Sequence, residues 1–181
     1  MTTRSSIERH HGASLLAAII VCGLVLPSTP RPWWAAAIVF IVPATLASGI
    51  DLATHRIPTR LVYPAAALLS AGIAVTSIVS GQLHVLVVAA LAAPATMGAW
   101  YLLALITGGY GMGDVRLALL CGLWAGTRGW DAVALSPVIA ILLGGVAAII
   151  MKLIWPARTH LPFGPSLALG ALLATVVADM T

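Results

Sequence analysis

Charged residues are scarce in this sequence of 181 amino acids. Only 8% of the residues are charged and 61% are hydrophobic, with a mean hydropathy of +1.07. Soluble domains carry about 25% charged residues, so this balance excludes an ordinary soluble domain. We expect an integral membrane protein, because a helix that crosses the hydrocarbon core needs about 20 mostly apolar residues.

Cysteine is also rare, and the two cysteines do not follow a metal-binding or disulfide pattern. Cys22 and Cys121 both lie within apolar stretches and form no CxxC pair. This excludes a recognisable zinc or disulfide framework, so we interpret both as small packing residues and expect no metal and no cofactor. The nine basic residues are scattered singly between apolar runs. That pattern argues against a nucleic-acid partner and leaves the lipid bilayer as the surroundings.

Apolar runs separated by charged residues, proline or glycine predict an all-α polytopic bundle of about seven transmembrane helices. Six would form the core and one would precede it. The predicted helices cover residues 14–26, 33–50, 61–80, 85–107, 115–125, 132–155 and 163–178. The fifth is too short for a full bilayer, so it is either longer or lies in a thinned or shielded region. We expect residues 1–32 to be a cytoplasmic tail with an anchor helix, and residues 33–181 to be the main membrane domain.

The first helix has a second interpretation. Arg4 and Arg9 precede a short apolar run, which is the layout of a secretory signal peptide. The segment 26–32 has no A-x-A-like cleavage site, which favours a retained anchor over a cleaved signal. Either choice leaves the orientation of the other six helices unchanged.

The distribution of basic residues predicts the orientation, because Lys and Arg collect on the cytoplasmic side. With the N-terminus inside, seven basic residues fall on the cytoplasmic side and two fall outside. The inside set is Arg4, Arg9, Arg56, Arg60, Arg116, Lys152 and Arg158, and the outside pair is Arg31 and Arg128. The same topology places Asp51 and Asp114 together on the cytoplasmic face.

Acidic residues are the scarcest charged group, with five in the chain. Glu8, Asp131 and Asp179 fall in a tail, an external loop and the C-terminal end. Asp51 and Asp114 remain, both at the membrane edge, where a carboxylate is costly and usually marks a function. A lone aspartate could equally end a helix and pair with a neighbouring arginine. Two on one face favour a functional site.

The sequence around each aspartate indicates how it would be positioned. Asp114 ends the segment 108–114, in which four glycines allow another chain to approach closely. It would also cap the helix that follows. Asp51 lies six residues before Ile57, and Pro58 biases Ile57 away from helical conformation, so the second helix must end between them.

These segments resemble the membrane domain of the type IV prepilin peptidase family, a group of GxGD-type membrane aspartyl proteases. Its hallmarks are an aspartate followed six residues later by Ile-Pro, and a GxGD segment. The matching residues here are Asp51, Ile57 and Pro58 for the first, and Gly111, Gly113 and Asp114 for the second. A third stretch, 161–170, is also similar. The resemblance covers about 33–178 in the right order.

The resemblance implies an aspartyl endopeptidase that cleaves the leader of prepilin or pseudopilin precursors at the cytoplasmic face of the inner membrane. Asp51 and Asp114 would be the catalytic carboxylates, without a cofactor. The partner would be a precursor with a basic leader followed by an apolar helix. The candidate substrate-binding residues are Arg56, Arg116, Pro162, Phe163 and Gly164.

The sequence also departs from the family pattern. Bifunctional members carry a further N-terminal region with four cysteines, associated with methylation of the new pilin N-terminus. This sequence shows neither, so we expect cleavage only, as in the short members that serve Flp-type (tight-adherence) pili. Arg116 stands where lysine is common and Thr59 where asparagine is typical, so substrate positioning is where this chain would differ.

Two other functions are compatible with the sequence. A small transporter could bind a proton or cation at the two aspartates, although such a site is expected near the bilayer midplane. A non-catalytic scaffold for pilus assembly would keep the same residues. His55 is a weaker candidate for substrate or headgroup contact, and most of the six tryptophans are expected at membrane interfaces.

Overall fold

The computed structural model describes residues 14, 16–154 and 162–180, and every secondary-structure element in these residues is a helix. The N-terminal helix Leu16–Val25 leads into two short 3-10 turns, η1 (Leu26–Ser28) and η2 (Arg31–Trp33). The longer helices that follow are α2 (Trp34–Thr54), α3 (Thr59–Val79), α4 (Leu83–Thr107), α5 (Met112–Gly126), α6 (Trp130–Ile154) and α7 (Gly164–Ala178). The predicted tail with Arg4 and Arg9, and the segment 155–161 with Arg158, lie outside the described residues.

Four of the described helices, α2, α3, α4 and α6, are long and apolar enough to cross a membrane. The 21 residues of α3 extend over about 31 Å at 1.5 Å per residue, which matches a hydrocarbon core of about 30 Å. The shorter α5 and α7 have 15 residues each. The predicted fold class is confirmed: this is an all-helical, multi-pass membrane protein.

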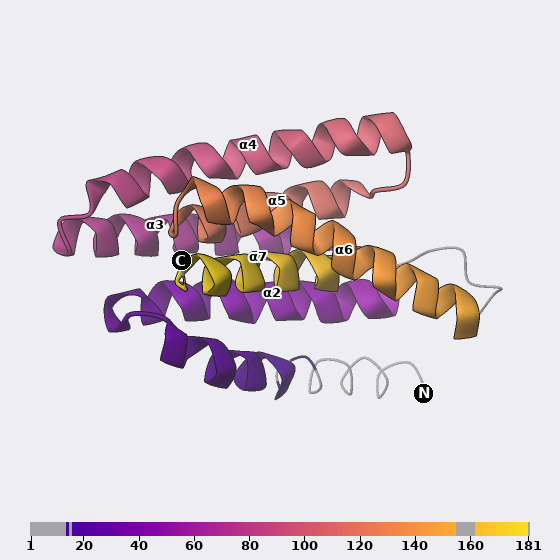
Figure 1. Cartoon of the computed structure of the whole chain (residues 1–181), viewed down its shortest axis with the longest axis horizontal. Coiled ribbons are helices and arrows are strands. Elements are labelled where there is room, and N and C mark those ends of the chain that lie inside the picture. Colours follow the sequence, from indigo (N-terminus) through magenta and orange to yellow (C-terminus); the bar gives the residue numbers. More distant parts are fainter. Residues whose placement is uncertain (1–13, 15, 155–161, 181) are drawn as a thin grey trace.

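Helix α5 is the most enclosed element of the bundle. Eleven of its 15 residues are buried, and it contacts α2, α3, α4, α6 and α7. Figure 1 shows it in the middle of the bundle, with α4 along one edge. Because protein surrounds it on most sides, its length does not have to match the bilayer. Of the alternatives for the short fifth helix, the structure therefore shows a shielded one, extended slightly beyond the predicted bounds.

Small residues allow α5 and α7 to lie close to their neighbours. A Cβ atom added at Gly126 of α5 would lie 2.6 Å from the Cα of Ala89 in α4. A Cβ added at Gly170 of α7 would lie 2.8 Å from the Cβ of Ala140 in α6. Close approach of this kind is how helices associate in a bilayer, where burial of apolar surface gives little driving force between them.

Aromatic packing completes the core around α5. Trp124 is fully buried, stacks on Phe40 of α2 with ring centroids 5.3 Å apart, and donates its indole N–H to Thr175 of α7 at 3.2 Å. Trp124 therefore packs inside the bundle and does not face lipid. Its ring packs against α2, and its N–H has a hydrogen-bond acceptor in α7.

Candidate active site

Asp51 lies in the last turn of α2 and is only 5% exposed. The sequence placed it just beyond this helix, but α2 continues to Thr54. His55 then ends it with a left-handed backbone conformation, φ 52°, and donates its N–H to the carbonyl of Asp51 at 2.8 Å. The carboxylate accepts the backbone N–H of Gly164, the first residue of α7, at 2.9 Å. The N-terminus of a helix interacts favourably with a carboxylate, so the start of α7 holds the side chain of Asp51 in place.

Asp114 lies in the first turn of α5 and is 8% exposed. It was predicted directly before the helix, but α5 begins two residues earlier, at Met112. Its carboxylate Oδ2 accepts the backbone N–H of Gly111 at 3.1 Å, which is one half of a capping box. Gly111 has no side chain to supply the other half. The capping role expected from the sequence is therefore present, and it engages one carboxylate oxygen.

The two aspartates meet at one end of the bundle, although 63 positions separate them in the sequence. Both line two adjoining cavities of about 600 Å³ and 290 Å³, and their carboxyl groups interact electrostatically. We call the larger cavity the aspartate cleft. It is lined by Asp51, His55, Thr107, Gly109, Tyr110, Gly111, Asp114, Ile141, Gly144, Gly145, Ala148 and Phe163. The cleft thus joins the ends of α2 and α4, the start of α5 and one face of α6.

Neither carboxylate is neutralised by an ion pair within the described residues. Arg116 instead donates to the hydroxyl of Thr59 at 3.1 Å, and Arg56 is exposed to solvent. Both arginines line the smaller cavity beside the aspartates. The alternative in which each aspartate ends a helix and pairs with an arginine is therefore wrong. Buried carboxylates without a counter-ion are costly, and such groups collect at functional sites.

The two sequence motifs pack directly against each other. A Cβ atom added at Gly113 would lie 2.9 Å from the Cβ of Ile57 and 3.3 Å from its backbone nitrogen. Ile57 is 7% exposed, and Pro58 follows it as the extended N-cap of α3. The second glycine of GxGD therefore has a steric reason, because it lets the α2–α3 loop lie against the start of α5. This contact holds the segments that carry Asp51 and Asp114 together.

We expect Gly113→Ala to destabilise the protein by about 1–3 kcal/mol, because the added methyl group would overlap with Ile57 close to its main chain. Gly111→Ala is the matched control, since its Cβ would lie 3.6 Å from the nearest neighbouring atom, Oδ2 of Asp114. Thermal unfolding of the detergent-solubilised variants measures the difference. Equal melting temperatures of the two variants would show that stability does not depend on the close Gly113–Ile57 contact.

Three aromatic rings form one wall of the aspartate cleft. Phe163 and Tyr110 line it, and Trp100 packs behind them, with ring centroids 5.1–5.4 Å apart. Burial and the negative charge of Asp114 both raise the pKa of Tyr110 above its usual value, so its hydroxyl stays protonated and able to donate. Phe163 was a sequence candidate. Trp100 and Tyr110 were not, and only the glycine-rich surroundings of Tyr110 offered a local signal.

The remaining sequence candidates are Gly164 and Pro162, and only Gly164 contacts a catalytic candidate. Gly164 donates its N–H to Asp51, and a Cβ there would lie 3.0 Å from Oδ2 of that carboxylate. Pro162 is half-buried and lines neither cavity. No group of three or more His, Cys, Asp or Glu side chains in the described part of the chain could hold a metal ion.

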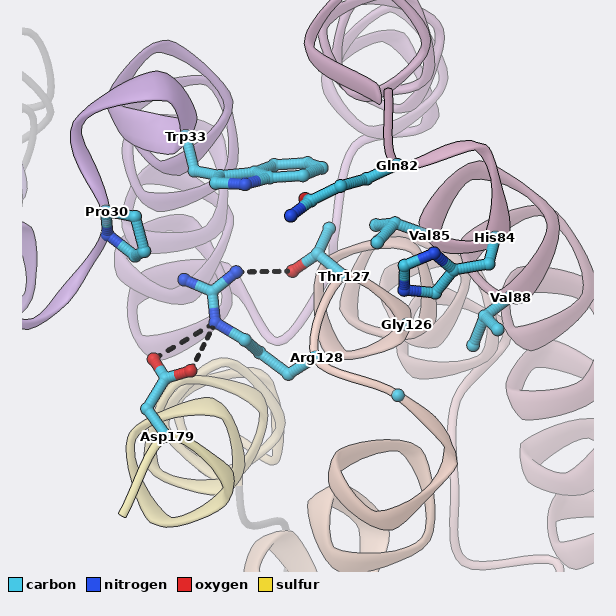
Figure 2. Close-up of a pocket in the computed structure, with 11 residues that line it drawn as sticks. Pro30, Trp33, Gln82, His84, Val85, Val88, Gly126, Thr127, Arg128 and Asp179 are labelled. Carbon is cyan, nitrogen blue, oxygen red and sulfur yellow. Dashed lines mark hydrogen bonds and ion pairs between the residues drawn. The ribbon is translucent and has the colours of Figure 1, made fainter. Parts of the chain in front are cut away.

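A cavity of about 320 Å³ at the other end of the bundle has a different character. Figure 2 shows Asp179, at the end of α7, paired with Arg128 after α5. The Nε atom of Arg128 lies 2.8 Å from Oδ1 of Asp179, and its Nη1 atom lies 3.4 Å from the hydroxyl of Thr127. The one acid in this cavity is thus neutralised and ties α7 to the α5–α6 turn. The aspartate cleft is therefore the candidate active site.

A family model described as the type IV leader peptidase family matches residues 38–149. The match covers more than half of the chain and includes Asp51 and Asp114, while the stretch 161–170 lies beyond it. Neither a curated protein nor a solved structure gave a match to this chain.

Proposed function

The chain belongs to the type IV leader peptidase family, and from this premise we propose that it is an aspartyl endopeptidase that removes the leader of prepilin or pseudopilin precursors. One observation carries the proposal. Asp51 and Asp114 come from different helices, are both buried, and line the same cleft without an ion pair among the described residues. That arrangement suits a pair of carboxylates that share acid and base roles.

The proposed reaction follows from the closeness of the two groups. Two neighbouring buried carboxylates cannot both be ionised cheaply, so one holds a proton while the other is charged. The charged one takes a proton from a water molecule, whose oxygen then bonds to the scissile carbonyl carbon. The protonated one donates to the carbonyl oxygen. Breaking the C–N bond, with a proton passed to the leaving nitrogen, yields a carboxylic acid and an amine. Since the pair titrates as a unit, the proton belongs to the pair and not to either residue.

The basic residues support a cytoplasmic active site. Among the described residues, Arg56, Arg60, Arg116 and Lys152 lie at the aspartate end of the bundle, and Arg31 and Arg128 lie at the other. The excess of Lys and Arg marks the cytoplasmic side. Arg56 and Arg116 suit main-chain carbonyls of the substrate or lipid phosphates. Their charge disfavours contact with the basic side chains of a leader.

The substrate class is tested by reconstituting the purified protein in liposomes with a precursor that has a basic leader and an apolar helix. We expect cleavage at the junction of these two segments, with both products identified by mass spectrometry. A panel of such precursors left intact would refute the peptidase proposal. Proton-coupled uptake by the same liposomes, without any cleavage, would instead support the transporter alternative.

A further inference from the structure

Two adjacent glycines in α6, Gly144 and Gly145, have different surroundings. A Cβ atom added at Gly144 would overlap with the ring of Phe163, so this glycine is needed for packing. A Cβ added at Gly145 would meet nothing within 4 Å. Only Gly144 is required for close packing, and Gly145 faces open space within the aspartate cleft.

On the cleft face of α6, Gly145 leaves open space between two residues that carry side chains, Ile141 and Ala148. Gly145 is spaced four residues after Ile141 and three before Ala148, so these three share one helix face, and all three line the aspartate cleft. The residues next to this face carry bulky exposed side chains; they are Leu142, Val146, Ile149 and Ile150. Contact with lipid therefore does not account for a glycine at position 145, because the lipid-exposed positions around it are filled with large side chains.

Helix α6 is also positioned to leave the cleft accessible. It packs chiefly against α7 and touches α4 over only a short stretch. In Figure 1, the C-terminal half of α6 diverges from α4 toward the aspartate end of the bundle. The aspartate cleft, of about 600 Å³, lies between the end of α4 and this half of α6. A peptide that reaches Asp51 and Asp114 through this opening must pass along the face that carries Gly145.

We propose that Gly145 determines substrate specificity, because it is the point where the main chain of a peptide substrate passes against α6. The inference rests on the proposed peptidase function and adds a residue and a path to it. Glycine is a poor helix former. Gly72 and Gly98 also lie in helices with nothing within 4 Å of an added Cβ, and Gly145 differs from both because it lines the aspartate cleft. Close approach of a substrate backbone accounts for a glycine at this position, since a side chain at 145 would narrow the path to the aspartates.

Gly145→Leu, with Gly72→Leu as its matched control, tests the proposal. Gly72 lies inside α3, a Cβ there would also meet nothing within 4 Å, and it is not part of the cleft. We expect Gly145→Leu to lower kcat/KM for leader cleavage about tenfold or more, mainly through KM, and Gly72→Leu to remain close to the parent. Gly145→Ala should give a smaller loss while keeping or raising the melting temperature, because alanine favours the helix.

A substrate series separates narrowing of the path from damage to the fold. Precursors with smaller residues beside the scissile bond should recover part of the cleavage lost in Gly145→Leu. In Gly72→Leu, the rate of cleavage relative to the parent should be the same for every precursor. Parent-like cleavage by Gly145→Leu, or an equal loss in both variants, would overturn this inference and leave the peptidase proposal intact. A parent protein that cleaves none of the precursors would overturn both.

Discussion

Replacing Asp51 with asparagine is expected to reduce leader cleavage on the order of 10³-fold, and Asp114→Asn should have the same effect. Asparagine has nearly the same shape and keeps an oxygen that accepts the N–H of Gly164 or Gly111, so the local hydrogen bonds can persist. What it lacks is the capacity to take up and return a proton. Because the two carboxyls act as a unit, the double variant should be little worse than either single one.

Stability separates this loss of chemistry from a loss of fold. Each replacement removes a carboxylate that is buried without an ion pair in the described structure, so the melting temperature in detergent should stay level or rise. Asp131→Asn is the matched control, since Asp131 is exposed in the first turn of α6 and distant from the cleft. It should cleave like the parent. Undiminished cleavage in Asp51→Asn or Asp114→Asn would refute the assignment of that aspartate.

Gly164→Val is expected to lower the rate of cleavage about 10²-fold, because misplacing a reacting group by about 1 Å can cost that much. A Cβ at position 164 would lie 3.0 Å from Oδ2 of Asp51 and 3.3 Å from its Cβ, so the side chain must shift. The backbone N–H that Asp51 accepts is retained. The measurement is kcat with a precursor substrate, and Gly164→Ala should lie between valine and the parent.

The control for Gly164 is Gly98→Val in α4, where an added Cβ meets nothing within 4 Å. It should leave the rate near that of the parent. A parent-like kcat in Gly164→Val would show that the position of Asp51 does not depend on clearance at the start of α7. An equal loss in both variants would attribute the effect to valine in a membrane helix and not to the aspartate.

Much of the fold could be predicted because its signals are local. Long apolar runs predicted each of the helices α2 to α7 to within about four residues, as expected for helix ends. The largest errors fell at the aspartates. Helix α2 continues past Asp51 because His55 takes a left-handed conformation, and α5 begins before Asp114 because the carboxylate caps it. Both endings depend on hydrogen bonds that apolar periodicity does not report.

Contacts between distant segments could not be predicted. Nothing around Trp100 indicates that it supports Phe163, and nothing around Gly164 indicates that its N–H binds Asp51. The glycines at 144 and 145 are indistinguishable in sequence, yet one faces a ring and the other an open cleft. A side chain's surroundings are set by the helices packed beside it, and no local pattern contains that information.

The sequence by itself determined that this is a helical membrane protein and that Asp51 and Asp114 are its unusual acids. Hydrophobicity is a property of each segment, and a charge in an apolar chain is visible wherever it occurs. Only the tertiary structure decided that the two aspartates share one cleft and that no arginine among the described residues neutralises them. Those facts depend on α5 lying among α2, α4 and α7, since packing alone brings residues 63 positions apart into one site.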